Sequence, residues 1–202
     1  DAIPAPEEWV PFSATSRRTY NTTGRVLWGK FYQDVDGSQR IESGVERDKM
    51  INISINNVPL KKQFVSFADQ NGQWKSLRMF PRAGHRPLKK GPQTMGLDPL
   101  PWPGRIQGFD VYRSVLGNLM RYEAPALNWF AILTTAPDNS WREEYLDIRI
   151  GPQPRELFLP PAGMPVEETQ DVGGFVSKKS ASDEGVDVDA VLERMRKERE
   201  QR

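Results

Sequence analysis

The chain contains no cysteine and only one histidine among its 202 residues. The first absence excludes disulfide bonds, cysteine nucleophiles and thiolate metal sites, and the second excludes sites that need several imidazole ligands. A Ser-His-Asp triad would have to use His85, for which the sequence offers no identifiable serine or threonine partner. We therefore predict a protein that is not an enzyme, with no catalytic residue, no cofactor and no metal ion.

An excess of one charge and long apolar runs are also missing. The chain has 28 basic and 27 acidic side chains, for a net charge of +1. This balance lacks the basic excess that is typical of nucleic-acid-binding domains, so we expect no nucleic-acid partner. No apolar run is long enough for a transmembrane helix, and peripheral contact with a membrane stays open.

Two acidic motifs do not predict a site. The stretch from Asp34 to Gly37 lacks the spacing of a calcium-binding loop, and a β-turn explains it. Glu143 and Glu144 are adjacent, so a strand would place them on opposite faces and prevent shared acid-base chemistry.

Short segments of alternating polarity dominate what is present. In the segment from Met50 to Asn56, Ile51, Ile53 and Ile55 fall on one side, which is the period of a half-buried strand. Turn signals recur at intervals of about ten residues without a helical period between them, which favours an antiparallel sheet. We expect roughly nine to eleven strands; the clearest further segments are Arg25 to Gln33, Gln39 to Glu46, Gln63 to Phe67, Trp74 to Phe80, Arg105 to Val115, Asn118 to Glu123, Leu127 to Thr135 and Trp141 to Ile150.

Turn residues predict the connections. Asn71-Gly72 and Asp36-Gly37 each suit a hairpin, because glycine and asparagine tolerate positive φ. A third hairpin is expected from Asn21 to Gly24. Strand faces that carry Arg40 and Glu42, or Arg142 and Glu144, should be wet. The fold class predicted is therefore all-β, a curved antiparallel sheet or incomplete barrel with one buried face.

Composition divides the chain into one domain with extensions. We expect an extended N-terminal arm over 1–11, an antiparallel β domain over 12–166, a polar linker over 167–186 and a short amphipathic helix over 187–202. Within the β domain, 81–104 should form a stiff loop, because it holds six prolines.

The proline-rich loop carries basic side chains and an apolar anchor at Trp102. Two interpretations stay open: a basic arm that lies on an acidic partner, or a cover over an open sheet edge. The basic side chains are Arg82, Arg86, Lys89 and Lys90.

The C-terminal segment has helical spacing. Asp187 can cap a helix whose apolar residues sit at i, i+3, i+4 and i+7, namely Val188, Val191, Leu192 and Met195. A helix this short is marginal alone, so it needs a surface, on its own sheet or in a groove of another chain. We favour the partner chain.

The first residues, from Asp1 to Pro6, look like the extended segment that remains after removal of a signal peptide. They predict an exported bacterial protein, periplasmic or extracellular. A cytosolic protein whose sequence simply starts here is the alternative.

Two stretches carry a resemblance. Lys30-Phe31-Tyr32-Gln33-Asp34 leads into Asp36-Gly37-Ser38-Gln39-Arg40, and Glu156-Leu157-Phe158-Leu159-Pro160-Pro161-Ala162-Gly163 follows the last long strand. This order resembles uncharacterised exported bacterial proteins of the acidobacterial type, which are themselves similar to the LolA-like lipoprotein-carrier fold. The resemblance covers Phe12 to Val166 and implies an antiparallel half-barrel whose concave face can receive acyl chains. The chain departs from the pattern at Met164, where an aromatic residue is common, and lacks obvious helices to plug the half-barrel.

Two functions follow as hypotheses. The first is a non-enzymatic accessory subunit that binds other proteins of a larger envelope or extracellular assembly. Its contacts would be Trp9, Trp102, the four basic residues of the loop and the apolar residues of the C-terminal helix. The alternative is a LolA-like carrier of a lipid or other apolar ligand, held near Trp28, Phe31, Phe64 and Trp74.

Overall fold

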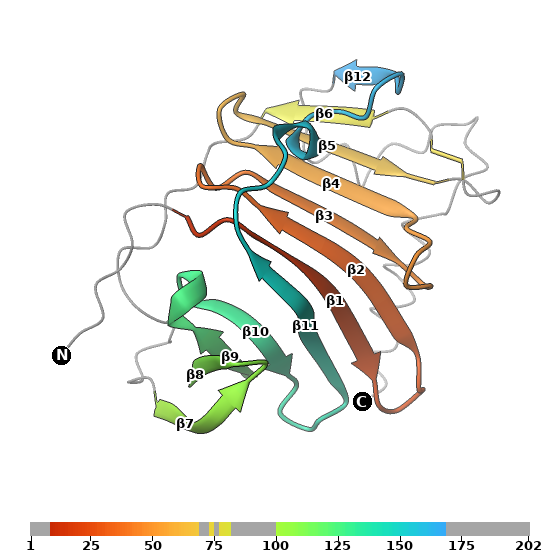
Figure 1. The fold of residues 1–202 in the computed structure, drawn as a ribbon. Helices are drawn as coiled ribbons and strands as arrows, with labels where there is room; N and C mark the ends of the chain where they lie inside the picture. Colours follow the sequence, from red (N-terminus) through yellow and green to blue (C-terminus); the bar gives the residue numbers. More distant parts are fainter. Residues whose placement is uncertain (1–8, 69–72, 75–76, 82–99, 169–202) are drawn as a thin grey trace.

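The computed structural model describes residues 9–68, 73–74, 77–81 and 100–168, which form one twelve-stranded sheet. Figure 1 shows the strands side by side in a twisted layer, with the N-terminal hairpins at one end and the later hairpins at the other. The order is β12-β6-β5-β4-β3-β2-β1-β11-β10-β9-β8-β7, and the sheet is not closed. The all-β prediction is confirmed.

The strands follow one another along the chain with two short 3-10 turns between the later ones. They are β1 (Phe12–Tyr20), β2 (Val26–Gln33), β3 (Gln39–Gly44), β4 (Asn52–Asn57), β5 (Lys62–Phe67), β6 (Leu77–Pro81), β7 (Leu100–Ile106), β8 (Phe109–Leu116), β9 (Leu119–Ala124), η1 (Pro125–Leu127), β10 (Phe130–Thr135), β11 (Trp141–Ile150), η2 (Arg155–Phe158) and β12 (Val166–Glu168).

Two antiparallel meanders make up the sheet. Strands β1 to β6 form one and β7 to β11 the other, and they join where β1 pairs with β11. The short β12 then pairs in parallel with β6, and it takes in Glu167 and Glu168, for which the composition predicted a linker. Across the described residues there is no α-helix, and no helix is long and apolar enough to cross a membrane.

The pairing register assigns each side chain to one of two faces. One row across β1 to β5 is Phe12, Gln33, Gln39, Asn56 and Gln63, and we call its side the Phe12 face. The opposite side, the Ile55 face, carries a row across β2 to β6 made of Tyr32, Arg40, Ile55, Phe64 and Met79. Because strand side chains alternate, these rows place every other residue.

The first hydrophobic core lies on the Phe12 face, at the junction of the two meanders. Phe12 and Phe31 from the first meander pack with Phe130 from β10, with ring centroids 5.0–5.2 Å apart. Leu127 of η1 and Ile132 of β10 are fully buried with them. Rings at this spacing add to the stabilisation that comes from burial alone.

The second core lies on the Ile55 face, over β4 to β6. Ile55, Phe64 and Leu77 are buried there under Phe158. Residues 151–165 provide this cover, because they cross the sheet after β11 and carry η2 in front of the first meander (Figure 1). Asn57 Nδ2 donates to the Phe158 carbonyl oxygen at 3.0 Å and fixes the crossing.

This arrangement corrects two expectations. The sequence predicted one buried face, whereas each face is buried at a different end of the sheet. Arg40 and Glu42 were expected to be wet, yet their side chains are only 15% and 14% exposed. The crossing segment is the physical reason, since Arg40 Nη1 donates to the Leu157 carbonyl oxygen at 3.1 Å.

The predicted single strand from Arg105 to Val115 is wrong. Gln107 and Gly108 both have positive φ, 52° and 83°, and make a two-residue hairpin turn between β7 and β8. Strand β7 also takes up Leu100–Gly104, which the sequence placed in the proline-rich loop. Prolines are tolerated there because β7 is the edge strand, where an N–H is not needed for pairing.

Two predicted turns are confirmed. Gly37 N donates to the Asp34 carbonyl oxygen at 3.1 Å between β2 and β3, and Gly24 N donates to the Tyr20 carbonyl oxygen at 2.8 Å between β1 and β2. Asn71-Gly72 lies outside the described residues, although β5 and β6 pair antiparallel as such a hairpin requires.

Two isoleucines on neighbouring strands test the face assignment. Ile55→Ala should lower the free energy of unfolding by about 2–5 kcal/mol, because the side chain is fully buried on the Ile55 face. Ile41→Ala on the Phe12 face should change it by less than about 0.5 kcal/mol, because Ile41 is 44% exposed. Urea unfolding followed by circular dichroism measures both, and equal losses would contradict the assignment.

Candidate binding face

A row of polar and aromatic side chains crosses the Ile55 face where the two meanders join. Glu144 of β11 lies opposite Arg17 of β1, Arg17 lies opposite Trp28 of β2, and Trp28 lies opposite Gly44 of β3. The crossing segment contacts β3 and β4 through η2. In the row itself, Glu144, Arg17 and Trp28 are half-buried and Gly44 is buried. We call Arg17, Trp28, Arg47, Arg142 and Glu144 the Trp28 cluster.

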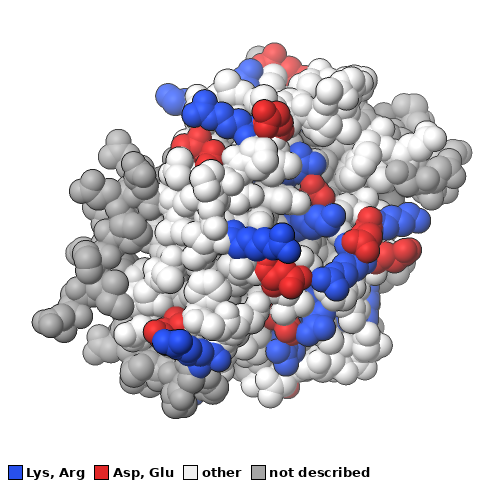
Figure 2. All heavy atoms as spheres, in the orientation of Figure 1, with Lys and Arg blue, Asp and Glu red and all other residues white. Residues whose placement is uncertain are grey.

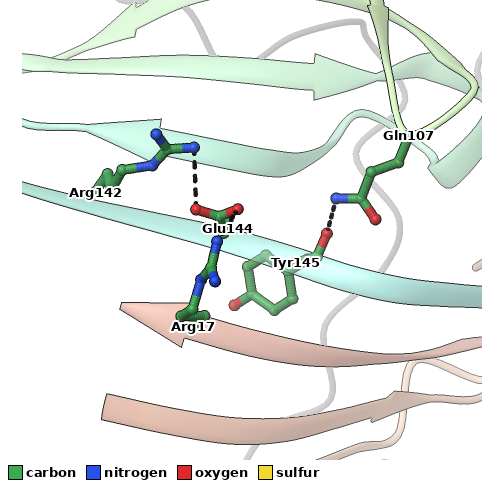
Figure 3. Close-up of polar contacts among 5 residues, drawn as sticks. All are labelled: Arg17, Gln107, Arg142, Glu144 and Tyr145. Atoms are coloured by element: carbon green, nitrogen blue, oxygen red, sulfur yellow. Dashed lines mark hydrogen bonds and ion pairs between the residues drawn. The ribbon is translucent and has the colours of Figure 1, made fainter. Parts of the chain in front are cut away.

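Glu144 lies between two arginines within this cluster. Its Oε1 is 2.9 Å from Arg17 Nη2 and its Oε2 is 3.0 Å from Arg142 Nη2 (Figure 3). One carboxylate therefore balances only one of two guanidinium groups, and a positive charge is left over. The two arginine side chains are 39% and 47% exposed, so solvent limits each contact to about 1 kcal/mol, and the pairs orient the arginines more than they stabilise the fold.

Trp28 is contacted by two arginines. The Cζ atoms of Arg17 and Arg47 lie 5.8 Å and 5.4 Å from the centroid of its ring, within the range of cation–π attraction. Arg47 also reaches Asp147 of β11 at 3.0 Å, so the loop after β3 is tied back across β1 and β2. The result is a half-buried indole edged by oriented guanidinium groups.

Gly44 allows that loop to fold over the face. A Cβ added at Gly44 would lie 2.1 Å from the Lys49 carbonyl oxygen, so no larger residue fits unless the loop moves. Ile51 N donates to the Ser43 carbonyl oxygen at 2.8 Å and closes the loop. The backbone of Lys49 therefore packs directly on β3, and Arg47 is carried toward Trp28.

Beside the cluster, the same face has a groove of about 420 Å3. Strands β2 to β4, the loop after β3, Trp74 and the crossing segment surround it, and its lining mixes charged and apolar side chains. The lining residues are Lys30, Arg40, Glu42, Asp48, Lys49, Met50, Ile53, Trp74, Pro161 and Met164. Figure 2 shows basic and acidic side chains next to one another over the face that Figure 1 presents.

The Phe12 face carries a similar group of side chains on the same two strands, β1 and β11. Arg18 Nη2 pairs with Glu143 Oε2 at 2.9 Å, and Arg18 Cζ lies 5.0 Å from the centroid of the Trp141 ring. Adjacent residues of β1 and β11 thus build one arginine–glutamate–tryptophan set on each face. This confirms that Glu143 and Glu144 point to opposite sides.

Tyr145 lies between this set and the first core. Its ring packs edge-on against Phe31 and Phe130, and Gln107 Nε2 donates to its carbonyl oxygen (Figure 3). Burial, with the nearby charge of Glu143, raises the pKa of the Tyr145 phenol well above its usual value.

Within the described ranges, no three His, Cys, Asp or Glu side chains are grouped as a metal site requires. His85 lies outside those ranges. The absence of a catalytic role stays a prediction.

The four residues proposed for an apolar ligand are not brought together. Phe31 is buried in the core on the Phe12 face, and Phe64 is buried in the core on the Ile55 face. Trp28 belongs to the cluster, and Trp74 lines the groove. Two of the four are thus core residues.

The residues proposed for partner binding are mostly outside the described ranges. Trp9 is described, and its backbone N–H donates to the Val35 carbonyl oxygen at 3.3 Å beside Gly37. Trp102 lies on edge strand β7. Eight others lie outside the described ranges, namely Arg82, Arg86, Lys89, Lys90, Val188, Val191, Leu192 and Met195.

Sequence reasoning did not single out Arg17, Arg47 or Lys30. The alternation in β11 did indicate that Arg142 and Glu144 share a face. The expected exposure is met by Arg142, at 47%, but not by Glu144, at 12%, because Arg17 and Arg142 both pair with its carboxylate. A pairing partner more than a hundred residues away is not encoded in spacing. No model of a known protein family matches this chain, and no curated protein is similar enough to match it.

Gly44→Ala should displace the loop after β3. The added methyl group meets the backbone of Lys49, so the stability should fall by about 1–3 kcal/mol. The Ile51 amide should also exchange its hydrogen faster, as measured by hydrogen exchange and NMR. Gly117→Ala is the control, since its cost comes from a positive φ of 63° in the turn between β8 and β9, with nothing within 4 Å of the added Cβ. Exchange at Ile51 as fast in that variant as in Gly44→Ala would contradict the account.

Tyr145→Phe should reduce the amount by which the free energy of unfolding falls at high pH. The raised pKa keeps the phenol protonated in the folded state while the unfolded chain loses its proton above about pH 10. The stabilisation that the protonated Tyr145 phenol contributes is therefore complete below about pH 10 and is lost as the pH rises above it. Urea unfolding at pH 8 and pH 11 should show a smaller drop for the variant than for the wild type; equal drops would show that this phenol is not the group responsible.

Proposed function

We propose that this protein is a non-catalytic accessory subunit that binds another protein of a larger assembly through the Trp28 cluster. The observation that carries the proposal is the half-buried Trp28 ring with the guanidinium groups of Arg17 and Arg47 against it. Tryptophan and arginine are the side chains most enriched at the centres of protein interfaces. Ion pairs to Glu144 and Asp147 hold the two arginines in place before a partner binds.

The charge of the cluster supports an acidic partner. Arg17, Arg47 and Arg142 face two carboxylates, those of Glu144 and Asp147, so one positive charge is unbalanced. Lys30 adds a further positive charge on the same face of β2. An acidic surface would be attracted by this excess, and its binding should weaken as salt screens it.

The lipid-carrier alternative has less support. Its apolar residues Phe31 and Phe64 fill two separate cores, on opposite faces of the sheet. A carrier needs those side chains around one cavity, whereas neither phenylalanine lines the groove on the Ile55 face. The unclosed sheet is compatible with a LolA-like incomplete barrel, and we keep that fold and an exported location as parts of the proposal.

Other contacts of the accessory subunit remain proposals as well. Trp9 of the N-terminal arm lies beside the turn between β2 and β3, at the end of the sheet remote from the turn between β1 and β2. The proline-rich loop and the C-terminal helix would extend the interface.

Trp28→Ala should weaken partner binding about 30-fold, which corresponds to roughly 2 kcal/mol for a central interface residue. A photo-crosslinking residue at Val26, on the same face as Trp28, identifies the partner in source cells. Titration calorimetry with the purified partner then gives the affinity at low and high salt.

Trp141→Ala is the matched control. It removes a tryptophan with the same kind of arginine contact from the opposite face, so it should leave the affinity within about twofold. Equal weakening by both substitutions would contradict the proposal, as would cross-links from Val26 that Trp28→Ala does not abolish.

A further inference from the structure

We propose that the groove beside the Trp28 cluster is a binding site for a small amphipathic carboxylate, a molecule with one anionic head and a compact apolar body. The inference goes beyond the proposed function, because it concerns a small ligand and does not depend on a protein partner.

Two lysines supply the head site. Lys30 on β2 and Lys49 in the loop after β3 both line the groove. Within the part of the chain that the structure describes, neither ammonium group has a carboxylate within 4.0 Å, although Glu42 lies opposite Lys30 on β3. Arg40 takes that carboxylate instead, with Nε at 2.7 Å from Oε1. Lys30 therefore keeps its donors for an anion.

The apolar part of the lining supplies the body site. Ile53 is 3% exposed and lies next to Glu42 across β3 and β4, so it belongs to the floor of the groove. Met50, Met164 and Trp74 line it as well. Methionine side chains adapt to ligands of different shape, and Trp74 is 37% exposed, which leaves its ring accessible.

Size and charge together select the ligand class. A volume of about 420 Å3 is within the range of small-molecule sites. The lining has three cations, Lys30, Arg40 and Lys49, against the acids Glu42 and Asp48, so the groove carries one excess positive charge. A neutral lipid would leave the excess positive charge unpaired, and a fully polar anion would leave the apolar floor in contact with water. An amphipathic carboxylate pairs with the charge and also covers the apolar floor.

Octanoate is the probe, with 1-octanol and octylammonium as matched controls of the same chain length. The full chain is labelled at its methionine methyl groups and titrated by NMR below the micelle concentration of each probe. Octanoate should shift the Met50 and Met164 signals while Met120 on β9 stays unchanged, and it should bind at least tenfold more tightly than either control.

The variant Lys30→Gln/Lys49→Gln separates the head site from the fold. Lys49 is exposed, Lys30 is half-buried, and neither makes an ion pair within the described ranges, so the thermal unfolding temperature should stay the same. Octanoate affinity should fall at least tenfold while 1-octanol affinity does not. Three results would overturn the proposal: octanoate binding no tighter than 1-octanol, shifts at Met120 as large as at Met50, or unchanged octanoate affinity in the double variant. None of these results bears on the protein partner, whose test uses Trp28.

Discussion

The pairing of β1 with β11 is the constraint on which the rest of the structure depends. It joins the first strand of the chain to a strand more than a hundred residues later and so merges two meanders into one sheet. Bringing such distant segments together has an entropic cost that local hairpins do not have. The aromatic contact of Phe12 with Phe130 forms beside this junction and offsets part of that cost. The ion pairs of Arg17 and Arg18 with two glutamates cross the junction and orient the side chains along it.

Two different parts of the chain each cover one region of this wide sheet. The second meander and η1 bury the Phe12 face at one end, and the crossing segment with η2 buries the Ile55 face at the other. Between the covers, the charged row on β11, β1 and β2 is half-buried on the Ile55 face. The surface proposed for binding is therefore a consequence of where the two covers stop.

Local chemistry predicts much of this fold, and long-range pairing accounts for what it misses. Alternation and turn residues indicate β4, β5 and the turns at Asp34 and Gly24, because each depends on neighbours in sequence. The split at Gln107-Gly108 is missed because glutamine is an unusual residue at positive φ. The Trp28 cluster cannot be found this way, since Trp28, Arg47 and Glu144 meet only through the register of β11, β1, β2 and β3. The dry pair of Arg40 and Glu42 escapes prediction for the same reason, because its cover begins after residue 150.

A disulfide across the junction tests the register of β1 and β11 most directly, and the absence of native cysteine makes the result unambiguous. Thr19 and Arg142 are directly opposite on the Ile55 face, within the Cα separation that a disulfide allows. Thr19→Cys/Arg142→Cys should oxidise to a monomeric disulfide, seen by mass spectrometry, while Thr19→Cys/Glu143→Cys should remain reduced because its side chains point to opposite faces. Oxidation of the second pair in preference to the first would contradict the register, and with it the assignment of Arg17, Trp28 and Glu144 to one face of the sheet.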